Sequence, residues 1–258
     1  NGDRQAWDKM INLMTRARLD AQYKEIQEYL DIDNFIDFIM VQFHIGPGNW
    51  EFYTARRRAP GEGFKFFSWD ADTSFREGQD YSLFRTPRNR NQPTAILQQL
   101  WDNAEFRQRF ADRLHMHLFN GGPLSSEGMQ ARWLALADQI EQAVVPETAR
   151  WGTINSAIPF TREGNWRPEI HRMHDTVIPD RVAASFADFL EVGLYPEIDA
   201  PVYNRHGGRI DPGHQLTMDG PGKLFFTLDG SDPRRGPIEF EMVPLLVEGA
   251  PARALVPT

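Results

Sequence analysis

The most constraining feature of this sequence is an aromatic-rich stretch that ends in two acids. Residues 64–69 read Phe-Lys-Phe-Phe-Ser-Trp, and such a density of aromatic side chains favours a largely buried β-strand over a helix. Asp70 and Asp72 follow two residues apart, so they point the same way if the chain stays extended. Two such carboxylates offer the oxygen ligands that hard cations prefer. The end of this strand is therefore a candidate metal site, although Asp-x-Asp after a strand is also a common loop or helix cap.

Composition limits the class of protein. With 258 residues, 41% of them hydrophobic, the chain can bury one large core and a small second module. A net charge of -8 argues against a nucleic-acid partner, and no apolar run reaches the ~18 to 20 residues that a membrane span needs. The absence of cysteine excludes disulfides and thiolate zinc sites.

Helical periodicity dominates the first three quarters of the chain. Two amphipathic helices are expected at residues 7–14 and 23–30, and the denser apolar pattern of residues 34–43 predicts a helix buried on most sides. Further helices are predicted from capping residues, glycines and prolines, the third of them ending before Pro146. They are expected at residues 93–101, 106–118, 125–145, from Pro168, and at 180–192.

A β-hairpin is predicted inside this helical part. Residues 51–56 read as a strand, and Ala-Pro-Gly-Glu-Gly at 59–63 turns the chain into the aromatic strand that begins at Phe64. The far end of this hairpin carries Asp70 and Asp72.

The composition changes after Pro196. Gly, Pro, Asp and Thr replace the helical pattern, and residues 213–218 and 223–228 read as two strands, with two more possible at 238–243 and 252–256. We therefore predict an α+β protein with a mainly helical domain at 1–196 and a small all-β, sandwich-like module at 197–258.

The order of the predicted elements suggests a chemistry. A buried helix, a polar turn, a strand, a second strand and a terminal Asp follow one another in the catalytic half of protein kinases too. There the turn supplies a base and an Asn metal ligand, and the Asp holds magnesium against the nucleotide phosphates. Hairpins between helices are common, so this order gives a hypothesis only.

Seven segments in the same order resemble the spore-coat-protein-H (CotH) kinase family of atypical protein kinases. They are residues 34–38, 50–58, 66–72, 106–113, 118–122, 147–152 and 193–196. The resemblance implies a fold like the C-terminal lobe of a protein kinase. It also implies a bacterial secreted or surface protein whose kinase-like domain transfers phosphate from ATP to Ser or Thr of other proteins.

The same resemblance assigns the candidate site. Asp70 takes the place of the family's magnesium-binding and nucleotide-binding Asp, with Asp72 beside it, and the implied cofactor is magnesium or manganese with ATP. In the preceding loop the family pattern is Gly-Asn-x-Asp-Trp followed shortly by Asn, whereas residues 46–51 here read Gly-Pro-Gly-Asn-Trp-Glu. The catalytic Asp is therefore absent from this loop. Asn49 is its nearest polar substitute, and Glu51 falls at the position of the Asn metal ligand.

The nucleotide-covering loop and phosphate-pairing Lys of an amino-terminal lobe have no counterpart here, so we expect a larger parent chain. Residues 225–234 resemble the small β domain that often follows such kinases and that ends chitobiase-type hydrolases. Taken from the residues alone, this segment is a strand that ends in an Asp-Gly turn.

Other polar groups are expected to be structural. Histidines two apart on a helix diverge, and those three apart lack an obvious third ligand, so zinc is not expected; these are His115 and His117, and His171 and His174. Arginines at 56–58, 85, 88 and 90 are candidates for gripping phosphate or acidic partners, but solvated loops explain them more readily.

Two functions remain open on the sequence. One is the family's Ser/Thr phosphorylation of surface or structural proteins, degenerate in this chain. The other is a non-catalytic structural or adhesive module of a secreted or cell-surface assembly. In either case we expect a protein substrate or assembly partner.

Overall fold

The computed structural model describes residues 4–46, 51–75, 92–154, 156–228 and 232–233. The fold is α+β, with helices in the majority and two small antiparallel hairpins. The chain divides between Pro196 and Glu197 into two compact units. No helix in the described ranges is long and apolar enough to cross a membrane.

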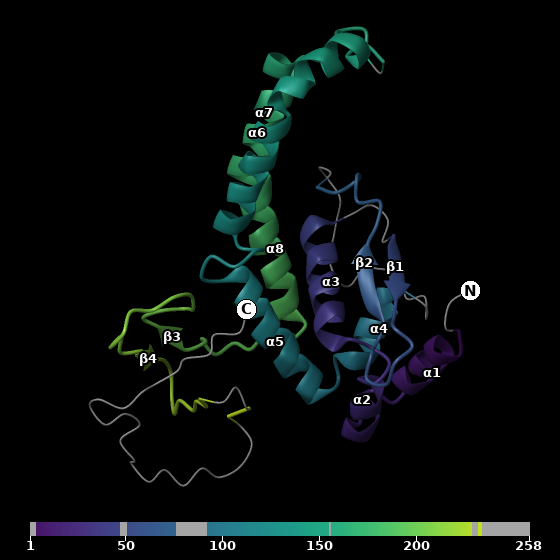
Figure 1. Cartoon of the computed structure of the whole chain (residues 1–258), viewed down its shortest axis with the longest axis vertical. Coiled ribbons are helices and arrows are strands. Elements are labelled where there is room, and N and C mark those ends of the chain that lie inside the picture. Colours follow the sequence, from purple (N-terminus) through teal and green to yellow (C-terminus); the bar gives the residue numbers. More distant parts are fainter. Residues whose placement is uncertain (1–3, 47–50, 76–91, 155, 229–231, 234–258) are drawn as a thin grey trace. The chain divides into compact units, whose positions relative to one another are not determined.

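The first unit holds nearly all of the regular structure that can be described (Figure 1). In chain order its elements are α1 Arg4–Met14, α2 Asp20–Ile26, α3 Ile32–Ile45, β1 Phe52–Ala55, β2 Lys65–Ser68, α4 Pro93–Leu100, α5 Ala104–Leu118, α6 Ser126–Trp151, α7 Arg167–Arg172 and α8 Ile178–Glu191. Two π-helical turns, Arg162–Trp166 and Met173–Val177, flank α7.

The centre of the core is α3, as its apolar sequence predicts. The Asp31 side chain accepts a hydrogen bond from Asn34 N at 3.0 Å and so caps the first turn. Phe35 and Phe38 on α3 contact the ring of Phe66 on β2, with centroids 5.1 and 5.5 Å apart. These contacts fix the hairpin on the helix, because aromatic rings bury large apolar areas.

The hairpin forms where the sequence predicts it. Phe52 pairs with Ser68 and Ala55 with Lys65, in antiparallel register. Phe64 and Phe66 are buried, whereas Phe67 and Trp69 are exposed, so the strand has one buried face. The backbone of Gly63 lies against Leu30 and Asp31 so closely that a Cβ there would come within 2.3 Å of Asp31 N.

A long helical arm follows α5, formed by residues 126–154 and 156–191. Within it α6 packs against α7 and α8 (Figure 1). The prediction that the helix ends before Pro146 is wrong, because α6 continues to Trp151. Pro146 and Gln142 are both exposed, so water can bond the Gln142 carbonyl that loses its helical partner.

The described part of the second unit contains one short hairpin, Val202–Tyr203 (β3) paired with Met218–Asp219 (β4). The predicted strands at 213–218 and 223–228 are wrong, apart from Met218. Asn204 explains the pairing, because its side chain bonds Gln215 O and Thr217 N at 2.8 and 3.0 Å. No sandwich is seen in this part, and residues 238–243 and 252–256 lie outside the described ranges.

Candidate functional site

Asp70 stands at the end of β2 in an unusual backbone conformation. Its φ is +49°, in the left-handed region that few residues other than Gly, Asn and Asp adopt. The change of direction ends the strand and starts a turn over residues 72–75. Asp70 and Asp72 are exposed. Neither carboxylate has a hydrogen bond or ion pair within the described part of the chain.

Two backbone hydrogen bonds bring this turn to the loop after α3. Trp69 N donates to Glu51 O at 3.1 Å, and Phe75 N donates to Ile45 O at 2.9 Å. The segment with Asp70 is therefore tied at both ends to the segments that flank residues 47–50. The structure thus places Ile45 and Glu51 beside the Asp70 segment, whereas Asn49 lies outside the described residues.

The described ranges contain no group of three or more His, Asp or Glu side chains arranged to hold a metal ion. Glu51 is exposed, and Asn49 lies outside the described residues. Two unpaired carboxylates still suit magnesium, which keeps several waters and is commonly held by one or two carboxylates plus substrate phosphates. The chain is not extended through Asp70, so strand geometry does not point the two side chains the same way as the sequence had suggested. Each carboxylate is still an oxygen ligand of the kind magnesium takes, and among the described residues the two do not form a complete protein cage.

Sequence reasoning missed two buried polar residues at the end of α3. Gln42 donates from Nε2 to Ser68 Oγ at 2.9 Å, two residues before Asp70. Its Oε1 is buried without a partner in the part of the chain that the structure describes. The apolar helix pattern gives no sign of this contact, because Gln42 stands among the core residues.

His44 is the second such residue, and its tautomer follows from its contacts. Ser185 Oγ donates to Val182 O at 3.1 Å, which uses its one proton. His44 Nδ1, 3.1 Å from the same Oγ, is then the donor in their hydrogen bond. Burial, with a smaller effect of the Arg181 charge, lowers the pKa of His44 to about 4. The neutral ring presents a bare Nε2 that has no partner among the described residues.

Arg181 on α8 completes this contact between the arm and the core. Its guanidinium donates to the carbonyls of Phe43 and His44, at 2.5 and 3.2 Å. These are among the last carbonyls of α3, which have no partner inside the helix. The positive charge also suits a helix C-terminus. Helix α8 therefore fixes the end of α3 directly before the candidate loop.

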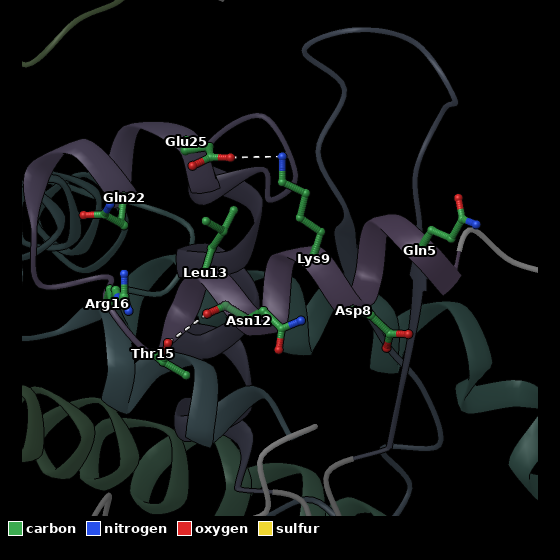
Figure 2. A pocket seen from close by; sticks show the side chains of 9 residues that line it. All are labelled: Gln5, Asp8, Lys9, Asn12, Leu13, Thr15, Arg16, Gln22 and Glu25. Atoms are coloured by element: carbon green, nitrogen blue, oxygen red, sulfur yellow. Dashed lines mark hydrogen bonds and ion pairs between the residues drawn. The ribbon is translucent and has the colours of Figure 1, made fainter.

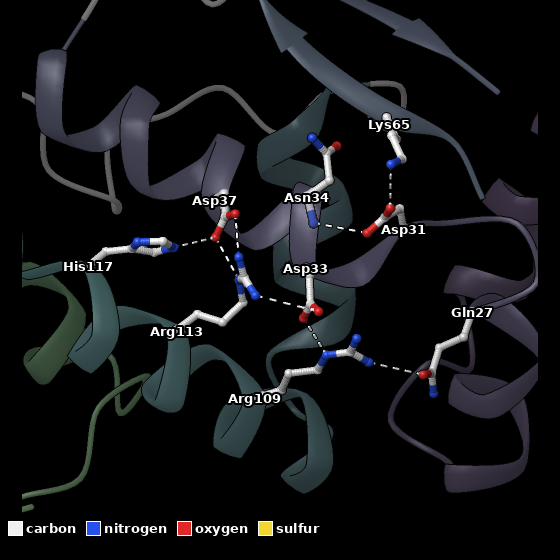
Figure 3. Close-up of polar contacts among 9 residues, drawn as sticks. All are labelled: Gln27, Asp31, Asp33, Asn34, Asp37, Lys65, Arg109, Arg113 and His117. Carbon is white, nitrogen blue, oxygen red and sulfur yellow. Dashed lines mark hydrogen bonds and ion pairs between the residues drawn. The ribbon is translucent and has the colours of Figure 1, made fainter. Parts of the chain in front are cut away.

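An ionic row joins α3 to α5 (Figure 3). Arg109 donates to Asp33 at 2.6 Å and to Gln27 at 3.1 Å. Arg113 and His117 both contact Asp37. Burial alone would raise the pKa of Asp37, but the hydrogen bonds from His117 and Arg113 lower this pKa below its usual value. The row is structural, because each carboxylate is already paired.

Three of the four histidines considered for zinc have other partners. His115 Nδ1 lies 2.9 Å from Tyr195 Oη, and His117 Nε2 lies 2.9 Å from Asp37 Oδ1. His174 contacts Asp175. The arginines at 85, 88 and 90 lie outside the described residues.

A shallow groove of about 760 Å³ lies between α1 and α2 (Figure 2). Its lining is polar, and Lys9 and Glu25 form an ion pair of 3.0 Å across it. None of Asn49, Glu51, Asp70 and Asp72 lines this groove. We therefore do not assign the candidate chemistry to it.

Comparison with protein families places the chain. Residues 1–181 match the family described as CotH kinase protein. The chain belongs to this family. The match covers the core of the CotH-family fold described above, from α1 through β1, β2 and α5 into α8, and so includes Asp70 and its surroundings. Searches of curated proteins and of solved structures returned no significant match.

The family match supports kinase-like function for this CotH-family chain at the level of the family. The second unit lies outside the matched residues, and its resemblance to a chitobiase-type β domain remains a prediction.

Proposed function

We propose that this CotH-family chain retains a metal and nucleotide site at Asp70 and has little or no kinase activity on its own. One observation carries the proposal. Asp70 leaves β2 in a left-handed conformation with an exposed carboxylate that has no partner among the described residues, and backbone bonds tie its segment to Ile45 and Glu51. A carboxylate in this place is suited to hold magnesium or manganese against the phosphates of ATP.

The chemistry would depend on these residues in simple roles. Asp70 and Asp72 would hold the divalent ion, and the ion would neutralise charge on the transferred phosphoryl group. Glu51 directly precedes β1 and its main-chain O accepts the hydrogen bond from Trp69 N, so we propose it as a third candidate ligand. Asn49 is the proposed group that orients an attacking hydroxyl.

The expected weakness of the reaction follows from Asn49. An amide cannot accept a proton as a carboxylate can, and residues 46–51 contain no Asp. Catalytic groups that act as a unit are strongly non-additive, so loss of the base alone removes most of the rate. For these reasons we propose a degenerate member of the family.

The second candidate function is a non-catalytic structural or adhesive module. The absence of an Asp from residues 46–51 favours this second function directly, since a fold can be kept when its catalytic activity is lost. In this reading, as in the first, we propose a secreted or cell-surface protein that acts on or assembles with other proteins. The two readings differ in whether phosphate is transferred.

The deciding experiment uses labelled ATP, magnesium or manganese, and a Ser-rich acceptor protein. Wild type is compared with Asp70→Ala and with Asp211→Ala, which removes an exposed carboxylate from the second unit. We expect label transfer near background for all three proteins. Transfer well above background that is lost in Asp70→Ala and kept in Asp211→Ala would show an active kinase, and would make Asn49 and Glu51 the residues to test next.

A further inference from the structure

The outer edge of β1 carries unpaired backbone groups. Trp69 N donates to Glu51 O, so residues 51 and 69 form a hydrogen-bonded pair of the antiparallel ladder. The alternation of such pairs makes Tyr53 with Phe67 the next one. The N–H and C=O groups of the residues between, Phe52 and Thr54, therefore point away from β2. They have no hydrogen-bond partner in the described part of the chain.

The outer edge of β2, in contrast, is closed at Phe64 and Phe66. Phe64 N donates to Tyr29 O at 2.7 Å, and Asp31 N donates to Phe64 O at 3.1 Å. The side-chain amide of Asn34 then binds the backbone of Phe66 as a neighbouring strand would. It accepts a hydrogen bond from Phe66 N at 2.6 Å and donates one to Phe66 O at 3.3 Å. Proteins usually close or block exposed strand edges because such edges pair with other chains. Among the described residues, the hairpin is therefore blocked along β2 and unpaired along β1.

The exposed face beside the open edge is aromatic. Tyr53, Phe67 and Trp69 are 59, 49 and 55% exposed, and the rings of Tyr53 and Trp69 lie 5.1 Å apart. Aromatic side chains stabilise cross-strand neighbours in a sheet. A strand added at β1 would place alternate side chains beside Tyr53, on this face.

Positive charge follows the same edge. Arg57 and Arg58 lie two and three residues beyond the end of β1 at Ala55, are exposed, and form no ion pair with the described residues. They stand out in a chain whose net charge is -8. An extended segment that runs along β1 and carries acidic residues at one end would meet these two guanidinium groups.

We propose that the β1 edge binds an extended, acidic segment of a partner protein as a third strand of the hairpin. The main-chain groups of Phe52 and Thr54 would supply the hydrogen bonds, and Arg57 and Arg58 the preference for acidic sequence. Alternating backbone donors and acceptors match a peptide and do not match a nucleic acid. This inference needs no phosphoryl transfer, so it stands or falls separately from the proposed function.

The binding test uses a fluorescein-labelled nine-residue peptide without nucleotide or metal. Its centre alternates Thr, Val and Tyr, and three Asp residues occupy one end. Controls are a peptide with Lys in place of Asp, and two isomers N-methylated at alternate central amides. We expect anisotropy to show at least tenfold weaker binding for the Lys peptide and for at least one N-methylated isomer. No binding by the Asp peptide, or equal binding by all four peptides, would overturn the proposal.

Two variants and one control variant test the residues proposed to bind the peptide. Thr54→Pro removes an outward N–H, which an edge strand tolerates better than loss of a ladder bond. Arg57→Glu/Arg58→Glu reverses the two charges, and Arg209→Glu/Lys223→Glu makes the same change of charge in the second unit. We expect at least tenfold weaker peptide binding for the first two variants and unchanged binding for the third. Equal weakening by both double variants would show a net-charge effect and contradict the proposal.

Amide hydrogen exchange followed by NMR gives a direct readout, also if Thr54→Pro does not fold. The amides of Phe52 and Thr54 should become protected when the peptide binds, whereas those of Tyr53 and Ala55 are already bonded to β2 and should change little. Peptide binding without protection at Phe52 and Thr54 would overturn the proposal. Protection of these amides that appears with rising protein concentration alone would show pairing between two copies of this chain, and it would also overturn the proposal. A single-stranded oligonucleotide that competes with the peptide and binds more strongly would overturn it as well.

Discussion

Arg113 on α5 binds both carboxylate oxygens of Asp37 on α3, through Nε to Oδ1 at 2.6 Å and Nη2 to Oδ2 at 2.5 Å. His117 adds a third contact, 2.9 Å from Oδ1. The two residues come from segments 34–38 and 106–113, which both carry the resemblance to the CotH family. The resemblance therefore has a structural meaning here, because the two segments hold the central helix and α5 together.

Replacing Asp37 by Asn should lower the free energy of unfolding by about 2 kcal/mol. The amide cannot accept both Arg113 hydrogen bonds, and it leaves a half-buried guanidinium with less compensation. Partial exposure of this pair keeps the loss below that of a fully buried one. Urea unfolding measures the change.

The matched control for this variant is Glu169→Gln, which breaks an exposed pair with Arg172 on one helix. This change should cost less than about 0.5 kcal/mol. Equal losses for the two variants would mean that the Asp37 pair contributes no more than a surface pair.

Stability should fall between pH 6.5 and 4 because of His44. Its folded pKa is lowered to about 4 from the ordinary 6.5, so in this window the unfolded chain binds a proton that the folded chain does not. The contribution of His44 to the free energy of unfolding is therefore fully present above pH 6.5 and is lost as the pH falls to about 4. The total loss is on the order of 3 kcal/mol. Urea unfolding at stepped pH measures the slope.

His44→Asn gives the control, since the Asn amide can donate to Ser185 from near the Nδ1 position without titrating. The slope between pH 6.5 and 4 should be smaller in this variant by the His44 share. An unchanged slope would show that His44 titrates normally in the folded protein.

Asp70 is the strongest candidate for metal binding. Calorimetry with manganese should show at least tenfold weaker binding for Asp70→Ala than for wild type, because the ion loses a carboxylate at the centre of the proposed site. Asp72→Ala should weaken binding less, and Asp211→Ala should have no effect. Equal binding by wild type and Asp70→Ala would remove the assignment.

Residues 1–196 and 197–258 should behave as two folding units, since helical periodicity gives way to turn-rich sequence at this point. Limited proteolysis with mass spectrometry should find early cuts at 197–212, and the larger fragment should keep the helical circular dichroism of the whole chain. Early cleavage between Asn34 and Phe43 would contradict this prediction.

Local patterns predicted much of the first unit. Apolar spacing gave α1, α3 and α5, and aromatic density together with the Pro-Gly turn gave the β1–β2 hairpin. These features depend on residues close in sequence, which is why they can be seen without a structure.

Features set by distant partners were not predicted. The β3–β4 pairing depends on Asn204, whose contacts are more than ten residues away. The bonds of Gln42 with Ser68 and of His44 with Ser185 also join distant parts of the chain. At the candidate site, sequence patterns marked Asp70 at the strand end, but its left-handed backbone and the position of Ile45 O could not be read from them.

The helical arm should unfold locally before the core does. Within the 26 residues of α6, Ala137 is the one buried residue that the structure describes, so the outer part of the arm gains little from exclusion of water. Segments with few buried apolar contacts open by local unfolding well before the core does. Arg181 and Ser185 lie where the arm contacts α3, so fraying that begins at the far end of α6 would stop at these contacts. The end of α3 would then stay ordered while the outer part of the arm unfolds locally.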